Sequence, residues 1–253
     1  MHVGLTWLGH STVLVELPGL TLLTDPFFRA RLGPLRRHGP VPDPRLLPAV
    51  DLVLLSHAHP DHFDAGSLAA LRGHPRLLVP TGMGAATRRV AQAAQVEELR
   101  VGEHVRVGDW TATAIGARHW RWPPMPRADS IGYLLEGPIG LYFAGDTGTF
   151  PGMRALAGRV DLALLPIGRW GPQPTPGHLT PRSAALVAAV IGARAVLPIH
   201  WGTLYPRGLD RFMPGPLHGP GAAFRTAMDA VAPDAVILGL VPGGSTSIAL
   251  SPT

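Results

Sequence analysis

The sequence contains no cysteine and no lysine. The absence of cysteine excludes disulfide bonds and thiolate metal ligands. The absence of lysine makes all 22 basic residues arginines, which exceed the 17 acidic residues and give a formal net charge of +5. A biased genomic base composition accounts for this usage, and anion binding by guanidinium groups is the functional alternative. The arginines are scattered and form no continuous basic helix, so we expect no nucleic-acid partner.

The sequence also lacks the features of a membrane-spanning or exported protein. No uninterrupted apolar stretch reaches the ~18 residues that a membrane-spanning helix requires. Residues 1–7 contain neither a basic segment nor a cleavage pattern, so no signal peptide is predicted. These absences favour a cytoplasmic protein without a membrane span.

The composition is that of a globular protein with a sizeable core. The chain has 253 residues, of which 46% are hydrophobic and 15% are charged, and this length suffices for one large domain. Its 31 glycines and 28 prolines predict many turns and long irregular loops. No linker divides the chain, so we expect a single domain over residues 1–253.

The predicted elements follow one plan twice, with strands first and helices alternating with strands afterwards. In the first half we expect strands at residues 3–8, 12–17, 20–24, 51–55, 76–79, 96–99, 104–107 and 110–117, and helices at 64–71 and 82–94. In the second half we expect strands at residues 130–136, 139–143, 161–165, 195–199, 235–238 and 245–250, and helices at 181–191 and 222–231. This order predicts two sheets packed on each other with helices outside, an α/β sandwich with internal duplication.

A cluster of potential metal ligands follows the strand predicted at residues 51–55. The segment Ser56-His57-Ala58-His59-Pro60-Asp61-His62 comes directly after that apolar run. Its three imidazoles and one carboxylate cannot share one face of a helix or a strand, so we expect a tight loop pointing into a cleft. A polar loop with chance histidines is the simpler alternative. Nitrogen and oxygen ligands suit Zn²⁺, Mn²⁺ or Fe²⁺.

Three further polar residues, His119, Asp146 and His200, stand at the ends of apolar strands. Each of them, taken alone, is more readily explained as a capping or core polar residue. Together they share one placement, a strand end followed by a loop, and they bring the potential ligands to seven. Placement alone does not divide these seven residues between metal sites.

The order of the potential ligands resembles that of the metallo-β-lactamase fold superfamily. An H-x-H-x-D-H cluster comes first, followed by a single histidine, an aspartate in a G-D-T-G turn and a last histidine. More narrowly, the chain resembles the branch containing N-acyl-phosphatidylethanolamine-hydrolysing phospholipase D, and the ascorbate-6-phosphate lactonase-like branch shares much of the pattern. The matching segments span nearly the whole chain: Trp7-Leu8-Gly9-His10-Ser11-Thr12, Leu23-Thr24-Asp25-Pro26, Leu55 to His62, Phe143-Ala144-Gly145-Asp146-Thr147-Gly148, Leu165-Pro166-Ile167-Gly168 and Ile199-His200-Trp201-Gly202-Thr203. The resemblance implies a four-layer αββα sandwich.

The resemblance also implies two metal sites. By this resemblance, the first metal is bound by His57, His59 and His119. The second metal is bound by Asp61, His62 and His200, and Asp146 bridges the two metals. The expected cofactors are two divalent ions, Zn²⁺ in preference to Mn²⁺ or Fe²⁺. Two such ions lower the pKa of a shared water toward neutrality, and the hydroxide attacks phosphorus or a carbonyl carbon. Asp61, which could alone serve as a general base, thereby becomes a metal ligand at the catalytic centre.

Three more residues are expected to assist the ligands. Asp25 precedes Pro26 and is either a turn residue or a carboxylate that orients a ligand imidazole. His10, after Gly9, is either a buried structural histidine or a similar support. A lone loop histidine such as His178 is usually solvated, but the phospholipase D-like branch has a histidine acting beside the metals in a matching H-x-x-P segment. The resemblance therefore implies that His178 stabilises an oxyanion or donates a proton.

Four loops are expected to surround the site: residues 27–50, 120–127, 169–177 and 204–221. Loops of such length inside a compact domain are usually functional or disordered. These loops are rich in arginine, aromatic residues, methionine and proline, which suit an amphiphilic anionic substrate. The expected substrate contacts are Arg36, Arg37, Arg121 and Trp170.

The leading hypothesis is phospholipase D-like hydrolysis of a phosphodiester, with a small-molecule or lipid-derived anionic substrate. The first predicted strand begins at residue 3 and leaves out the membrane-associated extension of the lipid enzyme, which favours a dispersed substrate. The alternative is a lactonase or other carboxylic-ester hydrolase, because one metal pair serves both reactions. A nuclease would need a basic arm or a clamp domain, and a non-catalytic metal-binding module would have lost ligands. Assembly into a homo-oligomer stays open.

Overall fold

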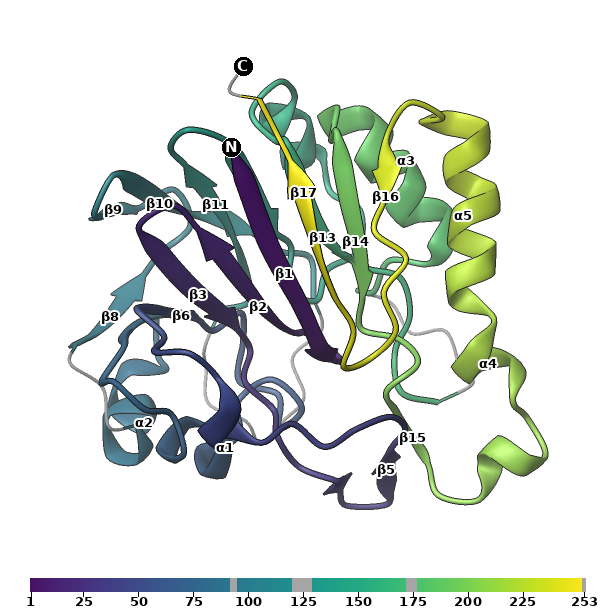
Figure 1. Cartoon of the computed structure of the whole chain (residues 1–253), viewed down its shortest axis with the longest axis horizontal. Helices are drawn as coiled ribbons and strands as arrows, with labels where there is room; N and C mark the ends of the chain where they lie inside the picture. The colour runs from purple at the N-terminus through teal and green to yellow at the C-terminus, as the bar shows by residue number, and fades with distance from the viewer. Residues whose placement is uncertain (92–94, 120–128, 172–176, 252–253) are drawn as a thin grey trace.

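Two seven-stranded β-sheets face each other in the computed structural model, which describes residues 1–91, 95–119, 129–171 and 177–251 (Figure 1). In hydrogen-bonded order, the first sheet consists of β17 (Ser245–Ala249), β1 (His2–Gly9), β2 (Thr12–Leu17), β3 (Leu20–Thr24), β6 (Leu52–Leu54), β7 (Arg76–Pro80) and β8 (Gln95–Leu99). The second sheet consists of β16 (Val236–Ile237), β14 (Ala195–Ile199), β13 (Leu162–Pro166), β12 (Gly140–Phe143), β11 (Ile131–Glu136), β10 (Trp110–Gly116) and β9 (His104–Val107). The predicted pair of packed sheets is confirmed.

The two sheets are built on the same plan. In the first sheet, β1, β2 and β3 pair antiparallel, and β3, β6, β7 and β8 then pair parallel. In the second sheet, β9 to β12 pair antiparallel, and β12, β13, β14 and β16 then pair parallel. This repetition confirms the internal duplication. The second repeat begins at β9 and not at residue 130 as predicted. Strand β9 pairs with β10 and β10 pairs with β11, so β9 and β10 belong to the second sheet.

Helices cover the outer face of each sheet. Helices α1 (Ala65–Ala69) and α2 (Gly84–Val90) lie on the first sheet, where Leu68 packs with Val53. Helices α3 (Pro181–Ile191) and α5 (Pro220–Val231) lie on the second sheet, where Phe224 joins its outer apolar cluster. Figure 1 shows the two helix pairs on opposite sides of the sheets, so the layers follow the order αββα. Helix α2 is shorter than the helix predicted at 82–94, and residues 92–94 lie outside the described residues.

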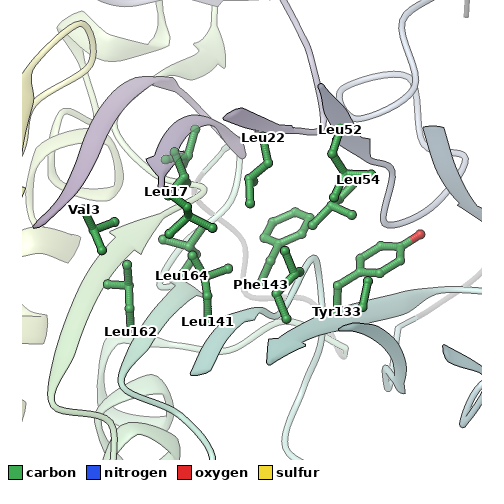
Figure 2. Close-up of a cluster of buried hydrophobic side chains, with 14 of the residues drawn as sticks. Val3, Leu17, Leu22, Leu52, Leu54, Tyr133, Leu141, Phe143, Leu162 and Leu164 are labelled. Carbon is green, nitrogen blue, oxygen red and sulfur yellow. The ribbon is translucent and has the colours of Figure 1, made fainter. Parts of the chain in front are cut away.

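The core between the sheets fixes the distance between the two halves of the chain. Val3, Leu22 and Leu54 point from the first sheet toward Leu141 and Phe143 of the second, and all five side chains are fully buried (Figure 2). Burial of each such side chain contributes about 1.5–3 kcal/mol to stability. The strand ends of both sheets are therefore held in a fixed relation to each other.

Two hydrogen bonds join the sheets next to the histidine cluster. The Tyr133 hydroxyl on β11 donates to the carbonyl of Leu55, 2.8 Å away, just after β6. The backbone N–H of Ile131 donates to the carbonyl of Ser56 at 3.0 Å. The start of the cluster is therefore attached to the second sheet as well as to its own strand.

The two long segments predicted as loops contain regular structure, which corrects that prediction. Residues 27–50 include β4 (Arg31–Leu32), β5 (Leu35–Arg37) and the 3₁₀ turn η1 (Pro44–Leu46). Residues 204–221 include β15 (Leu204–Pro206), the 3₁₀ turn η3 (Leu209–Arg211) and α4 (Gly215–His218). Strands β15, β5 and β4 form a third, small antiparallel sheet. The two segments gain order from each other, because β15 pairs with β5.

None of the helices in the described ranges combines the length and the apolar character that crossing a bilayer demands. A cytoplasmic location remains a prediction, as does the single-domain organisation.

Candidate metal centre

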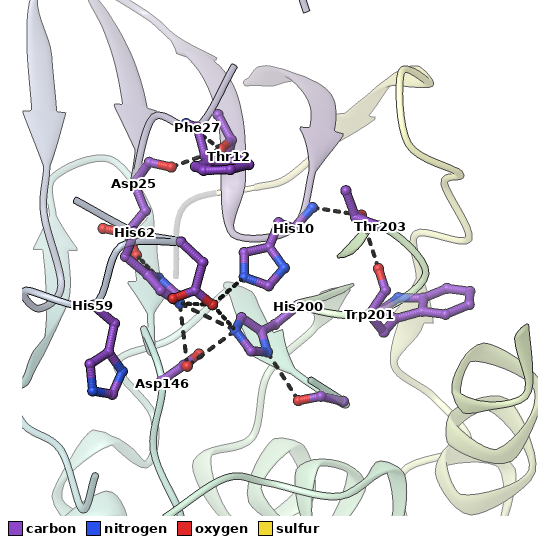
Figure 3. Close-up of polar contacts among 12 residues, drawn as sticks. His10, Thr12, Asp25, Phe27, His59, His62, Asp146, His200, Trp201 and Thr203 are labelled. Atoms are coloured by element: carbon purple, nitrogen blue, oxygen red, sulfur yellow. Dashed lines mark hydrogen bonds and ion pairs between the residues drawn. The ribbon is translucent and has the colours of Figure 1, made fainter. Parts of the chain in front are cut away.

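The predicted ligands and their supporting residues come from six strand ends that meet at one edge of the two sheets, with His119 following β10. The histidine cluster follows β6, Asp25 follows β3, and His10 follows β1. From the second sheet, Asp146 follows β12 and His200 follows β14. Because the carboxyl ends of parallel strands share an edge, β3 and β6 deliver their side chains to the same place, and β12 and β14 do likewise. Figure 3 shows these side chains converging.

One cluster consists of His57, His59 and His119. One ring nitrogen from each lies within 4.8 Å of the others. The closest pair is His59 Nδ1 and His119 Nε2, 3.0 Å apart. The buried Nε2 of His57 has no hydrogen-bond partner among the described residues. Three ring nitrogens therefore point into one space, and the contact between His59 and His119 leaves His57 Nε2 unsatisfied among the described residues.

A second cluster consists of Asp61, His62 and His200, with His10 beside them. His62 Nε2 and His200 Nε2 are 3.2 Å apart, and Asp61 Oδ2 lies 3.6 Å from the former and 3.7 Å from the latter. His10 Nε2 lies 2.9 Å from Asp61 Oδ2. The structure thus adds His10 to the three residues that the family resemblance grouped together.

Asp146 lies between the two clusters. Its Oδ2 is 3.3 Å from His62 Nε2 and 3.1 Å from His200 Nε2. Its buried Oδ1 has no hydrogen-bond partner in the described part of the chain. Asp146 also forms a possible ligand group with His119, which belongs to the first cluster. One carboxylate therefore reaches both clusters, as a bridging ligand must.

The hydrogen bonds behind the histidines set which ring nitrogen faces the site. Asp25 Oδ2 accepts from His62 Nδ1 at 2.7 Å and from the Ser56 hydroxyl at 2.5 Å. The Ser56 oxygen lies 2.9 Å from His57 Nδ1, and because its proton goes to Asp25 it accepts from that ring. His57 and His62 are both left with Nε2 as the free lone pair.

Backbone carbonyls perform the same task for the other two histidines. His119 Nδ1 donates to the carbonyl of Gly177, and His200 Nδ1 donates to the carbonyl of Gly168, each at 3.0 Å. Both rings therefore present Nε2 to the site, while His59 presents Nδ1. Carboxylate and carbonyl partners of this kind are typical of histidines that bind metal.

The charges of the site are strongly coupled. Burial raises the carboxyl pKa of Asp146, but the neighbouring His200 and His62 outweigh it and hold that pKa well below its usual range. Burial lowers the imidazole pKa of His62, but Asp146 and Asp61 outweigh it and raise that pKa well above its usual range. Burial, together with His62, holds the pKa of His57 well below its ordinary value. Ionised carboxylates thus sit among buried imidazoles.

This arrangement fits divalent metal ions. His59 Nδ1 and His119 Nε2 lie 3.0 Å apart, and His62 Nε2 and His200 Nε2 lie 3.2 Å apart. The Nδ1 atoms of His62, His119 and His200 already donate to other partners, so their Nε2 lone pairs converge on the site. The donors are all nitrogen and oxygen, which suits Zn²⁺, Mn²⁺ and Fe²⁺.

Backbone strain marks the same region. His10, Asp25 and His200 have positive φ angles of 55°, 32° and 62°. Non-glycine residues seldom adopt this conformation, which costs energy and concentrates at functional sites. His10 is held by its neighbours: its N–H donates to Thr203 Oγ1 at 2.7 Å, and its carbonyl accepts from Trp7 Nε1 at 2.9 Å. The fold thus maintains three unfavourable conformations at the candidate centre.

His178 lies beside the centre rather than in open solvent. Its Nε2 is 3.3 Å from Asp146 Oδ2, and its side chain is 17% exposed. It precedes α3, whose N-terminus is fixed by Thr180: the Thr180 hydroxyl accepts from the N–H of Ser183, and Pro181 occupies the first helical position. The cap holds the segment two residues after His178.

A cavity of about 410 Å³ opens next to the clusters. Its lining is largely apolar and consists of Leu32, Gly33, Pro34, Leu35, His59, Pro60, Asp61 and Trp170. The β4–β5 turn forms one wall, so the segment 27–50 does lie near the site. Trp170, an expected substrate contact, also lines this cavity. The space beside the ligands is thus suited to an apolar group.

The expectation for Arg37 is wrong. Its side chain is buried and donates to the carbonyls of Leu8 at 3.0 Å, Phe27 at 2.5 Å and Arg29 at 2.9 Å. Burial lowers its pKa to about 10. Strand β5 alternates inward and outward, so Leu35 and Arg37 point inward. Arg37 therefore holds three backbone segments together instead of meeting substrate.

The other two arginines have different outcomes. Arg36 is exposed on β5 and is not among the residues that line the cavity, so its contact with substrate stays a prediction. Arg121 and the loop at 120–127 lie outside the described residues.

Sequence reasoning missed Ser56, Arg169 and the two carbonyls that orient His119 and His200. Ser56 directly precedes the first histidine, and its position could have suggested a hydrogen bond to the ligands. Backbone carbonyls leave no signal in a sequence. Arg169 follows the Gly168 of a recognised motif, and only its spatial neighbours distinguish it from the other arginines.

A family profile described as "Beta-lactamase superfamily domain" matches residues 21–201. A "metal-dependent hydrolase" of Nitratidesulfovibrio vulgaris is 33% identical to this chain over 259 residues. The match covers 98% of this chain and 96% of that protein. The chain belongs to the metallo-β-lactamase superfamily of metal-dependent hydrolases. Within the solved structures, a metallo hydrolase of Ignicoccus hospitalis shares the metallo-β-lactamase fold, with a TM-score of 0.74 and 20% identity over 99% of this chain and 100% of that one.

Two further relatives are longer than this chain. An uncharacterised Mycobacterium tuberculosis protein is 36% identical over 221 residues, which are 80% of this chain and 59% of that protein. The N-acyl-phosphatidylethanolamine-hydrolysing phospholipase D 1 of Caenorhabditis elegans is 33% identical over 236 residues, which are 82% of this chain and 65% of that protein. The chain thus spans about six-tenths of the length of these relatives.

Proposed function

We propose that this protein is a binuclear metal-dependent hydrolase of phosphodiesters that carry an apolar group. The observation that carries the proposal is the pair of ligand clusters joined by Asp146, with a largely apolar cavity against His59 and Asp61. The similarity to a phospholipase D that cleaves a phosphodiester in N-acyl-phosphatidylethanolamine supports this reaction class over ester hydrolysis.

In this proposal the two clusters hold one divalent ion each. The ligands of the first ion are His57 Nε2, His59 Nδ1 and His119 Nε2, and those of the second are Asp61, His62 Nε2 and His200 Nε2, with Asp146 shared. Ions held there supply Lewis acidity, which activates water for attack and polarises a phosphoryl oxygen. Zn²⁺ suits the ligands best, and Mn²⁺ or Fe²⁺ also suit them.

The remaining side chains orient the ligands and manage a proton. Asp25 and Ser56 fix the tautomers of His62 and His57. His178 Nε2 lies 3.3 Å from Oδ2 of Asp146, beside the ligand clusters. From there it is placed to donate a proton to the leaving oxygen or to stabilise negative charge on the phosphoryl group. These roles require no protein nucleophile.

The cavity determines which part of the substrate is recognised. Leu32, Leu35 and Trp170 offer an apolar surface next to Asp61 and His59. An apolar substituent of the substrate would occupy this space, while its phosphodiester would face the ligand clusters. A dispersed amphiphilic anion therefore suits the site better than a small polar sugar phosphate.

The proposal is tested by a substrate panel on protein reconstituted separately with Zn²⁺, Mn²⁺ and Fe²⁺. The panel contains bis(p-nitrophenyl) phosphate, a glycerophosphodiester bearing a long acyl chain, an acyl lactone and a p-nitrophenyl carboxylic ester. We expect the highest kcat/KM on the phosphodiesters and a preference for the acylated one. Highest kcat/KM on the lactone would reject the phosphodiester in favour of the ester-hydrolase alternative.

The Asp146→Ala variant tests the metal assignment. Because Asp146 reaches both clusters, we expect this variant to lose metal and to show no turnover above background. Near wild-type activity with metal bound would contradict the binuclear assignment. Wild-type protein that binds far less than one equivalent of metal and hydrolyses nothing would support a non-catalytic module.

A further inference from the structure

Arg169 stands beside the ligand clusters without belonging to them. It follows Gly168, whose carbonyl accepts the hydrogen bond that orients His200. The backbone at Arg169 is therefore fixed one residue from a ligand contact. The side chain is partly buried, unlike most arginines on this surface.

The guanidinium of Arg169 stacks on a wall of the cavity. Its Cζ lies 5.2 Å from the centre of the Trp170 ring, a cation–π geometry. Trp170 lines the cavity together with His59 and Asp61. A positive charge thus accompanies the apolar surface that leads to the clusters.

The charge of Arg169 interacts electrostatically with two carboxylates of the candidate metal centre. Burial lowers the pKa of Arg169, while the negative charges of Asp146 and Asp61 act to raise it. A guanidinium remains protonated in any such environment. The side chain therefore brings a permanent positive charge within electrostatic range of both carboxylates.

We infer that Arg169 is a specificity-determining residue that binds the anionic oxygen of the substrate while Trp170 packs against its apolar group. The inference rests on the proposed phosphodiesterase function and names the feature that separates an anionic diester from a neutral ester. Guanidinium groups match phosphate oxygens with paired donors, and the Trp170 ring limits the rotamers available to the side chain. The site would then select amphiphilic anions by charge and by apolar contact at once.

The test compares Arg169→Met, Arg169→Lys and the control Arg89→Met, which changes an exposed arginine on α2. Zinc-loaded protein is titrated calorimetrically with phenyl phosphate, and KM and kcat are measured on bis(p-nitrophenyl) phosphate. Loss of a charge-assisted hydrogen bond corresponds to roughly 10–100-fold in affinity. We expect Kd and KM to rise by this factor in Arg169→Met with kcat unchanged, partial recovery in Arg169→Lys, and wild-type values in Arg89→Met.

Each outcome separates this inference from the proposed function. Unchanged phenyl phosphate affinity in a folded, zinc-loaded Arg169→Met protein overturns the role of Arg169, whatever the enzyme hydrolyses. An equal loss of affinity in Arg89→Met also overturns it, because the effect would then be general electrostatics. Wild-type protein that binds phenyl phosphate through Arg169 but cleaves only neutral esters rejects the phosphodiesterase function and leaves the anion site standing.

Discussion

Asp25 shows how one carboxylate can organise two ligands of different clusters. Its Oδ1 accepts from the Ser56 N–H at 2.7 Å, and its Oδ2 accepts from the Ser56 hydroxyl and from His62 Nδ1. Through Ser56 it also sets the tautomer of His57. Burial raises the carboxyl pKa of Asp25, and His62 and Ser56 only partly oppose it. The residue is thus costly to bury, and its hydrogen bonds to the ligands compensate for that cost.

Replacing Asp25 and Ser56 separately should affect the two clusters differently. Asp25→Asn loses the acceptor of His62 Nδ1, whereas Ser56→Ala loses the acceptor of His57 Nδ1 and leaves Asp25 bound to His62. We expect a fall of about 10–100-fold in metal affinity or activity for each variant, with both ions weakened in Asp25→Asn and mainly the first in Ser56→Ala. Competition with a chromophoric chelator measures the two affinities. Equal loss of both ions in Ser56→Ala would contradict the separate roles.

His178→Ala should reduce turnover without removing metal. Its Nε2 faces Asp146, but the proposed ligand sets are complete without it. We expect kcat to fall by about 100-fold or more, as for other general acids, while KM and metal content stay near wild type. Steady-state kinetics with elemental analysis checks this. A parallel fall in metal content would make His178 a ligand instead of a proton donor.

That the seven candidate ligands lie close together could be predicted from sequence, because they follow apolar strands. Asp146 and His200 gave that signal as clearly as the cluster at His57. The division into two clusters could not be predicted in this way, since it depends on which strands are neighbours in space. Arg37 was misassigned because an arginine in a proline-rich segment looks solvent-exposed until the alternation of β5 turns it inward.

At the scale of elements, the small sheet of β4, β5 and β15 is the part that sequence patterns missed. Each of its strands has only two or three residues, too few to show alternation. The pairing of Leu204 with Arg37 joins segments from opposite ends of the chain. The longer strands and α3 carry their own periodicity and caps, and were predicted close to their observed bounds.

Arg37 should be essential for this small sheet. Arg37→Met leaves the carbonyls of Leu8, Phe27 and Arg29 without their buried donor, and we expect the free energy of unfolding to fall by about 2–4 kcal/mol. The matched control is Arg36→Met on the neighbouring, exposed position, where we expect a change within about 0.5 kcal/mol. Urea denaturation of both variants measures the difference. Equal stability of the two variants would contradict the bridging role of Arg37.

At the scale of the whole molecule, the ligands are divided between the two halves. His57, His59, Asp61 and His62 follow β6 of the first sheet, and His119, Asp146 and His200 come from the second half. The interior between the sheets is apolar along most of its length. The ligand clusters therefore depend on the two sheets being packed against each other.

Chelation should consequently lower the thermal stability of the entire protein. At a free metal concentration of about 100 times Kd, each of the two ions adds about 2.7 kcal/mol to stability. For a protein of this size we expect EDTA to lower Tm by about 10–20 °C, since each kcal/mol shifts Tm by about 2–4 °C. Differential scanning calorimetry measures the shift. Asp146→Ala should show little or none of it, and an equal shift in that variant would place the chelated metal elsewhere.

The split origin of the ligands also governs when a metal can be acquired. The first-half residues are synthesised early, but a cluster that includes His119 or His200 cannot close until the second sheet has formed and docked. Metal bound there would join distant parts of the chain as a cross-link does, and such cross-links stabilise most when the loops they close are long. Nascent or half-folded chains would therefore hold metal weakly, so firm retention of the ions would report that both halves have folded and met.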